Sequence, residues 1–292
     1  MNDENNNCWA AIDVMGKILQ GKLSLTWEEF NKAGYFILMP AFWEPINLKV
    51  FRASFINDND ELINQKFRYS YPPKKYCNKP GRCHLAGFPV FYCASEFLGA
   101  IQETIITSKS KTILEKYNNI IYVGEWGLST KKKYMALDIR RQYPIKDTSK
   151  NEFCIGAYIY FLNQLFSSER GYDISSGLSF MLMHGVKKDD KIYQIFEGGC
   201  DAIIYSSVAK RGLFTNYVFN PSIIDNHELE LRRVFKLKIP VINWYDAIRN
   251  TTTLPMEIIS VGKPISKEGN LLLWAKPETS DMIFIDSFSK KI

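Results

Sequence analysis

Apolar residues recur at helical spacing near the start of the chain. These residues lie three or four positions apart, at Trp9, Ile12, Met15 and Leu19. They would share one face of an amphipathic helix, and the pattern predicts a second short helix around Trp27 to Lys32. We expect residues 1–45 to form a helical extension that packs against the rest of the protein.

Strands and helices are predicted together through the middle of the chain. Short runs rich in Val, Ile and aromatic residues predict strands at Tyr35 to Met39, Leu48 to Phe55, 89–95, Ile120 to Val123, Tyr134 to Ile139 and 201–208. Apolar residues on one helical face predict helices at 96–107, Glu152 to Phe166 and Ser175 to Met183, and a short helix that ends at Gly198 and Gly199.

The segment from Ile56 to Lys79 shows neither the apolar spacing of a helix nor the apolar run of a strand. It is polar, rich in Tyr and interrupted by Pro, which predicts a long loop without regular strands. Long ordered loops often carry function, and a lid over a binding site is one such role.

The pattern changes again after Pro221, where strands are separated by turns. They are predicted at Leu231 to Ile239, Met256 to Val261, Leu271 to Ala275 and Met282 to Asp286. Long helices do not alternate regularly with strands, so we predict an α+β fold and not a doubly wound parallel sheet. Residues 46–222 would form the main domain, and residues 223–292 a β-rich extension packed on the same body.

Composition places the chain among ordinary globular proteins. Its 292 residues are 46% hydrophobic, which is enough to bury a core without disulfides. It contains no run of eighteen apolar residues, and its polar, acidic start lacks the features of a secretory signal. We therefore expect a cytoplasmic protein that does not enter a membrane.

The six cysteines are interpreted as reduced thiols, because they are sparse and no export signal is present. Cys77, Cys83, His84 and Cys93 are the one tight group of metal-capable side chains. They lack the paired spacing of a zinc site, so no metal is expected.

The formal net charge of +6 favours partners that carry phosphate. The basic clusters at 131–133 and 140–141 are short, and no nucleic-acid reader module is recognisable. Nucleic acid is therefore a disfavoured partner. The sequence also lacks the glycine-rich phosphate loops of common nucleotide-binding proteins.

Two separated motifs carry the chemistry. The first, PGRCHLAGFPVFYCASEFLGAIQE, contains Arg82, Gly87, Pro89, Tyr92 and Glu103. The second follows more than ninety residues later and contains Asp201, Tyr205, Ser207, Val208, Asn216, Phe219 and Pro221. In residue type and order both motifs resemble the RES-domain family, which is named for its Arg, Glu and Ser residues.

The resemblance covers roughly Val50 to Pro221, and Arg52 corresponds to an Arg that the family carries on an upstream strand. His84 stands where the family usually has Asn, and Ser206 stands where it usually has Pro. The stretch between Arg52 and Arg82 is longer than the family pattern.

The resemblance implies a fold similar to that of ADP-ribosyltransferase toxins, with mixed and antiparallel sheets flanked by helices. Characterised members of the family consume NAD, either by splitting it or by transferring ADP-ribose, and many are the toxin of a toxin–antitoxin pair. NAD would then be a substrate, and an antitoxin protein a partner. A second copy of the chain is another partner to consider.

The residue types suit NAD, which presents a pyrophosphate, two riboses and a cationic pyridinium ring. Nicotinamide leaves as a neutral molecule, so one carboxylate is enough, unlike glycoside hydrolysis with its paired carboxylates. Glu103 would bind the ribose hydroxyls and stabilise the oxocarbenium-like transition state. The binding residues would be Arg52, Arg82, His84, Tyr92 and Ser207, with Arg82 and Ser207 also placed in the catalytic set.

Other interpretations stay open at this point. Without the resemblance, Glu103 would be a solvated helix residue, Tyr92 a core residue and Ser207 the donor of a strand-end hydrogen bond. The acceptor of the ADP-ribosyl group could be water, phosphate or a macromolecule. A cleft that binds NAD or ADP-ribose without turnover is the non-enzymatic alternative.

Overall fold

Eight predicted strands and two that the sequence pattern did not predict, at Phe42–Glu44 and Thr215–Phe219, assemble into a ten-stranded mixed sheet in the computed structural model. The structure describes residues 2–32, 42–44, 48–108, 112–128, 134–140, 150–168, 172–184, 186–188, 191–193, 199–207, 214–239, 254–266 and 269–289. In sheet order the strands are β1 (Phe42–Glu44), β5 (Tyr134–Asp138), β8 (Ala202–Ser206), β9 (Thr215–Phe219), β3 (Phe91–Ala94), β2 (Lys49–Ser54), β4 (Ile120–Leu128), β10 (Leu229–Lys238), β11 (Glu257–Pro264) and β12 (Leu272–Ala275). A separate hairpin pairs β6 (Val186–Lys188) with β7 (Lys191–Tyr193).

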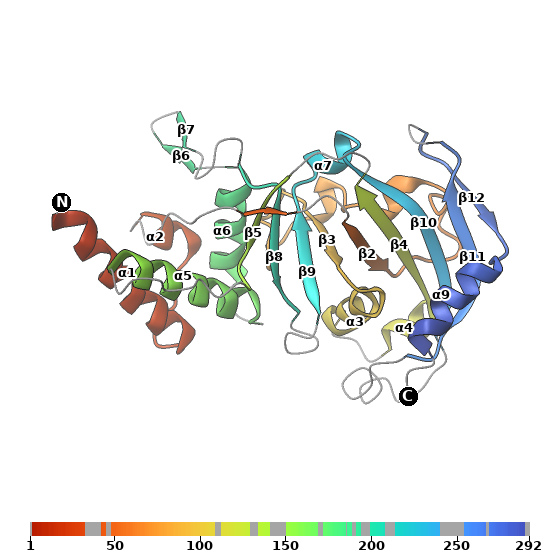
Figure 1. Cartoon of the computed structure of the whole chain (residues 1–292), viewed down its shortest axis with the longest axis horizontal. Helices are drawn as coiled ribbons and strands as arrows, with labels where there is room; N and C mark the ends of the chain where they lie inside the picture. Colours follow the sequence, from red (N-terminus) through yellow and green to blue (C-terminus); the bar gives the residue numbers. More distant parts are fainter. Residues whose placement is uncertain are drawn as a thin grey trace.

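Most helices lie at the two ends of this sheet or below its middle, and α7 lies above it (Figure 1). They are α1 (Asn2–Leu19), α2 (Trp27–Lys32), α3 (Phe97–Thr107), α4 (Ile113–Lys116), α5 (Lys150–Phe166), α6 (Tyr172–His184), α7 (Ser222–Asp225) and α9 (Thr279–Ser289). Figure 1 shows α1, α2, α5 and α6 together at the end that carries β5 and β8. The C-terminal helix α9 lies at the opposite end with β10 and β11. The prediction of an α+β fold is confirmed.

The sheet is nearly divided in its middle. β3 pairs with β9 along its whole length, and β2 pairs with β4 along its whole length. β2 and β3 themselves meet at one residue pair, Phe51 with Ala94. The sheet therefore consists of two five-stranded halves that separate from each other beside this pair.

Alternation along the strands fixes which residues face which core. On β2, Phe51 and Ala53 join the cluster around α3, whereas Val50 joins the cluster on the other face. On β3, Tyr92 packs toward the core around α5 and α6, and Phe91 faces the other side. Because successive side chains on a strand point to opposite faces of the sheet, neighbouring residues on these strands lie in different cores.

Most predicted elements form close to the expected positions, but one is wrong. Met282 to Asp286 was predicted as a strand and lies inside α9. The apolar residues Phe284, Ile285 and Phe288 recur at helical spacing and pack against the cluster around α3. A five-residue window is too short to reveal that period. The predicted strand at Tyr35 to Met39 and the short helix before Gly198 lie outside the described residues.

The segment from Ile56 to Lys79 is an ordered loop with two short 3-10 helices, at Lys66–Tyr69 and Lys74–Tyr76. Tyr69 is buried in the cluster on the face opposite α3. The backbone N–H of Leu272 donates to the carbonyl oxygen of Asn64 at 2.8 Å, which ties the loop to β12. A lid motion of this segment would have to break such contacts.

Candidate active site

A tight turn presents Arg82. The backbone N–H of Gly81 donates to the carbonyl oxygen of His84 at 2.9 Å, which closes the turn. A Cβ atom at position 81 would lie 2.2 Å from the imidazole ring of His84, so a side chain there would displace that ring. Arg82 and Cys83 are the two central residues of this turn.

Two tyrosines hold the guanidinium group of Arg82. Its carbon lies 5.7 Å from the ring centre of Tyr172, at the start of α6, and 5.9 Å from that of Tyr205 on β8. Its Nη2 donates to the Tyr172 hydroxyl at 3.4 Å. Burial acts to lower the pKa of Arg82, but these two tyrosines raise it above its ordinary value overall. Arg82 is therefore a fixed cation.

Glu103 on α3 lies at the centre of a hydrogen-bonded cluster. Its Oε1 accepts a hydrogen bond of 2.5 Å from the Ser207 hydroxyl and one of 2.9 Å from the Asn216 side-chain amide. Ser207 is 1% exposed and Asn216 4% exposed, so both donors are buried. The structure thus brings Glu103 of the first sequence motif and Ser207 of the second motif together.

The backbone places the members of this cluster with little freedom. Asn216 pairs in register with Tyr205 on one side and with Ala94 on the other. The backbone N–H of Ser207 donates to the Phe214 carbonyl oxygen at 2.8 Å. Helix α3 follows β3 almost directly, and a Cβ atom at Gly99 would approach the Phe214 ring to 3.1 Å. This close approach brings α3 against Phe214, whose carbonyl oxygen accepts the hydrogen bond from Ser207.

Tyr92 and His84 support the Arg82 turn. The Tyr92 hydroxyl accepts a hydrogen bond of 2.6 Å from the backbone N–H of Cys83 and lies 3.3 Å from Nδ1 of His84. Burial raises the pKa of Tyr92 well above its ordinary value and lowers that of His84. The contacts of Tyr92 are therefore those of a neutral tyrosine that anchors the turn, and its role in binding NAD stays a prediction.

Arg52 lies on the other face of the sheet. It alternates with Phe51 and Ala53, which face α3, and its Nη1 donates to Ser54 Oγ at 2.7 Å and to the Tyr69 carbonyl oxygen at 3.3 Å. Burial lowers its pKa to about 10. These contacts do not bring Arg52 to Glu103, and its role in binding NAD stays a prediction.

Three residues of the cluster were not assigned a role from the sequence. Tyr205 and Asn216 belong to the second motif, so their position in the motif was a signal that they accompany Ser207. Tyr172 belongs to neither motif, and its contact with Arg82 spans ninety residues of chain. No local spacing in the sequence points to that contact.

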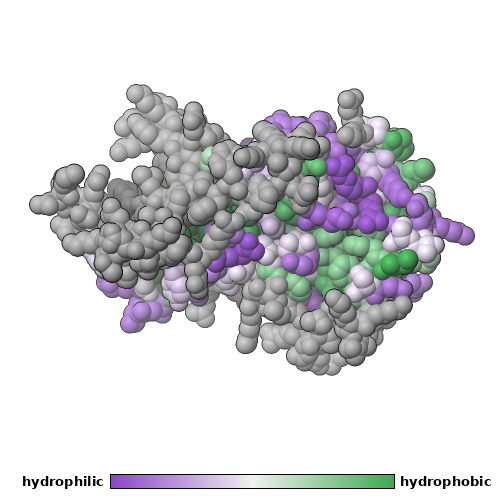
Figure 2. Space-filling model, viewed as in Figure 1, coloured by the Kyte–Doolittle hydropathy of each residue, from purple (hydrophilic) through white to green (hydrophobic). Residues whose placement is uncertain are grey.

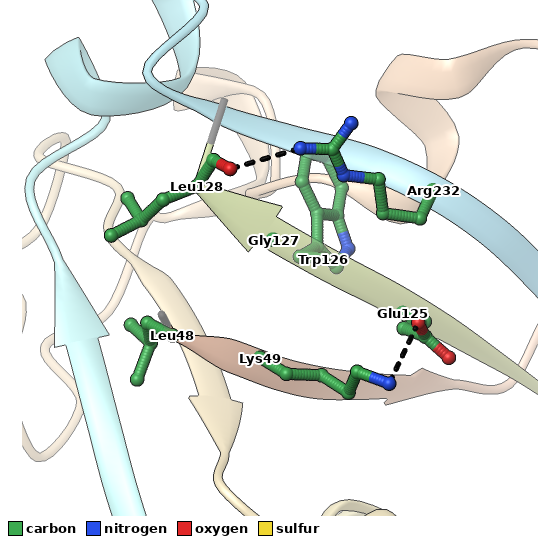
Figure 3. A pocket seen from close by; sticks show the side chains of 7 residues that line it. All are labelled: Leu48, Lys49, Glu125, Trp126, Gly127, Leu128 and Arg232. Carbon is green, nitrogen blue, oxygen red and sulfur yellow. Dashed lines mark hydrogen bonds and ion pairs between the residues drawn. The ribbon is translucent and has the colours of Figure 1, made fainter. Parts of the chain in front are cut away.

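A shallow pocket of about 290 Å³ lies elsewhere, between the start of β2, the end of β4 and β10 (Figure 3). Its lining residues are Leu48, Lys49, Glu125, Trp126, Gly127, Leu128 and Arg232. Lys49 pairs with Glu125 at 3.3 Å, and Arg232 donates to the Leu128 carbonyl oxygen at 2.9 Å. The pocket shares no residue with the Glu103 cluster and its cations are already engaged.

The part of the chain that the structure describes offers no metal site and no membrane-spanning helix. Within it, no group of three or more His, Cys, Asp and Glu side chains could hold a metal ion. None of the described helices is both long and apolar enough to cross a membrane. Cys77, Cys83, Cys93 and Cys200 are buried free thiols.

Comparison with known proteins finds likeness among solved structures but not among sequences. No protein-family model matches the chain, and no curated protein sequence matches it. Among solved structures, the chain is similar to a chain in the crystal structure of the M. tuberculosis MbcT–MbcA toxin–antitoxin complex. The sequences are 11% identical, the match covers 72% of this chain and 92% of that chain, and the TM-score is 0.40.

Proposed function

We propose that this protein consumes NAD by cleaving the bond between nicotinamide and ribose, with Glu103 as the carboxylate that acts at the ribose. The observation that carries the proposal is the hydrogen bond of 2.5 Å from Ser207 to Glu103. It joins residues 104 positions apart that the two RES-like motifs contain. A solvated helix residue would not need two buried donors on one carboxylate oxygen.

The chemistry follows from the charges that change during cleavage. Positive charge develops on the ribose as nicotinamide departs, and a fixed carboxylate stabilises it in the transition state. The leaving group departs neutral, so the site does not need an acid to protonate it. Arg82 is held by Tyr172 and Tyr205, and its planar set of N–H donors matches a pyrophosphate oxygen pair.

The acceptor of the ADP-ribosyl group is the next question for this site. Water would give an NAD glycohydrolase, phosphate a phosphorylase, and a protein or nucleic acid an ADP-ribosyltransferase. The resemblance to RES-domain proteins supports a toxin role in the cytoplasm, with an antitoxin protein as partner. All three reactions release nicotinamide, so that product is the common measurement.

The test is to incubate the purified protein with NAD, with and without phosphate, and to quantify nicotinamide. We expect release by the wild-type protein and a loss of about 10²-fold or more in Glu103→Gln, since an electrostatic group at a developing charge has this effect. Glu115→Gln, on the exposed surface of α4, is the matched control and should keep full activity.

Two results would contradict the proposal. Absence of nicotinamide release under both conditions, and also with cell lysate as a source of acceptors, would show that the protein is not this enzyme. Full turnover by a folded Glu103→Gln variant would show that another carboxylate acts at the ribose. Binding of NAD without turnover would instead favour a non-catalytic sensor.

A further inference from the structure

Two hydrogen-bond donors to Glu103 converge on the same oxygen. Ser207 Oγ lies 2.5 Å and Asn216 Nδ2 2.9 Å from Oε1. We infer that Asn216 is a positioning residue which, together with Ser207, fixes the plane of the Glu103 carboxylate for catalysis. The inference rests on the proposed function, and it assigns Ser207 to act on Glu103 and not on the substrate.

The setting of Asn216 suits this role. Its backbone lies between β8 and β3, paired with Tyr205 and Ala94, so strands on both sides hold it. Its side chain emerges on the face of Val218, which belongs to the apolar core around α5 and α6. Burying an amide without a hydrogen bond costs free energy of folding. Glu103 is an acceptor that forms this hydrogen bond with Asn216.

Ser207 is equally restricted. It is 1% exposed, and its single hydroxyl hydrogen is donated to Glu103. Little of its surface is left for a substrate hydroxyl or phosphate. Its part in catalysis is therefore indirect and runs through the carboxylate.

Fixing one oxygen has a kinetic consequence. A glutamate side chain has three rotatable bonds, and holding it in one geometry costs conformational entropy. Two rigid donors on Oε1 set the carboxylate plane and with it the direction of Oε2 before substrate arrives. Such preorganisation lowers the cost of reaching the transition state, so its loss should reduce kcat more than it changes KM.

The first test removes the amide. We expect Asn216→Ala to lower kcat for nicotinamide release by about 10-fold to 100-fold, with KM for NAD changed by less than about threefold, because a displaced group near the chemistry has costs of this order. Asn220→Ala, just beyond the end of β9, is the matched control and should keep wild-type kinetics.

The second test keeps the size of the side chain and changes its charge. In Asn216→Asp two carboxyl groups would lie within hydrogen-bonding distance, and such a pair shares one proton. While the proton is held, the introduced carboxyl group donates to Glu103 as the amide does. Once it is lost the two anions repel each other. Activity relative to wild type should therefore be highest near pH 5 and should fall as the pH rises toward 8.

Tyr205, Cys83 and Arg82 keep their charge across this range, and His84, whose pKa burial lowers from 6.5, is present in both wild type and Asn216→Asp. Burial raises the pKa of Tyr205 well above its ordinary value and that of Cys83 to about 12. Arg82 stays cationic, because its pKa lies above its ordinary value. A fall in activity with rising pH that appears in Asn216→Asp and is absent from wild type therefore reports the introduced carboxyl group.

The outcomes separate the inference from the proposed function. A wild-type protein that releases no nicotinamide overturns the proposed function and this inference with it. An active wild type whose Asn216→Ala variant keeps kcat, or whose Asn216→Asp variant follows the wild-type pH profile, overturns the inference alone. If Asn216→Ala does not fold, Asn216→Asp below pH 5.5 decides, since a role restricted to folding predicts no rescue of kcat at acidic pH.

Discussion

His84 is a site residue whose charge the fold disfavours. Burial lowers the pKa of its imidazole from the ordinary 6.5, and the ring packs over Gly81. The unfolded chain therefore binds a proton at a higher pH than the folded protein does. The stability that neutral His84 contributes is fully present above about pH 6.5. It is lost as the pH falls from that value through the pKa of His84 in the folded protein.

We predict that this loss is smaller in His84→Asn. Urea unfolding at pH 7.5 and pH 5 would measure the free energy of unfolding of both proteins. The difference between the two pH values should be smaller for the variant. Burial also lowers the pKa of His184, so part of the pH dependence should remain in both proteins. An identical pH dependence in wild type and His84→Asn would contradict the prediction.

The sequence motifs indicated the part of the candidate site in which motif residues contact one another. Arg82, Glu103 and Ser207 were all selected, and the structure places Ser207 on Glu103. The face that Arg52 occupies could not be read in the same way, because a shift of one residue in strand register moves a side chain to the other face. The partner of Arg82 on α6, Tyr172, depends on how that helix packs, which no spacing reveals.

At the scale of elements, a close contact between α2 and α6 joins the N-terminal helices to the rest of the protein. A Cβ atom at Gly177 would lie 1.9 Å from the Trp27 ring, so the two helices meet where a side chain is missing. The backbone N–H of Trp27 also donates to the Asp173 carboxylate at 2.6 Å, which favours the start of α2. The contact is therefore specific in both packing and capping.

We predict that Gly177→Ala destabilises the protein by about 1–3 kcal/mol, the usual cost of overpacking a filled interior. Gly16→Ala is the matched control, because it is another helical glycine and a Cβ atom there meets nothing within 4 Å. It should stabilise α1 by about 0.5–1 kcal/mol, since alanine is the better helix former. Thermal and urea unfolding would check the opposite signs. Equal effects of the two substitutions would contradict the close packing.

Sequence patterns identified elements best where a long run kept one period. α5 and α6 were predicted within a few residues of their bounds, because each carries several turns of apolar residues. α9 was missed because the apolar run Met282 to Asp286 spans five residues of an eleven-residue helix. The near separation of the sheet at Phe51 and Ala94 could not be predicted, since the sequence of one strand does not specify which distant strand it pairs with.

At the scale of the whole molecule, the C-terminal segment is attached to the sheet by packing and by a buried ion network. α9 places Phe284 and Phe288 against the core around α3, and their rings contact Phe97. Hydrophobic surface covers part of this half of the molecule in Figure 2, and Met282 and Ile283 are exposed on α9 at 45% and 65%. The helix is therefore amphipathic only in part, and polar contacts help to fix its position.

Arg233 on β10 provides those contacts. It donates to Asp281 of α9 at 2.6 Å and to Glu125 of β4 at 3.0 Å, and its guanidinium carbon lies 5.1 Å from the Phe284 ring centre. The side chains of both carboxylates are less than 10% exposed. One cation thus serves two buried anions on different elements, although Lys49 also reaches Glu125 at 3.3 Å.

We predict that Arg233→Met lowers the free energy of unfolding by about 3–5 kcal/mol, because removing one partner leaves a buried charge uncompensated. Arg232→Met is the matched control on the same strand. Its guanidinium is more exposed and pairs with Glu230 at 3.2 Å, so its loss should cost about 1 kcal/mol or less. Limited proteolysis should cleave α9 faster in Arg233→Met than in Arg232→Met, since release of the helix exposes its backbone. Equal stability and equal cleavage of the two variants would show that aromatic packing alone holds the helix in place.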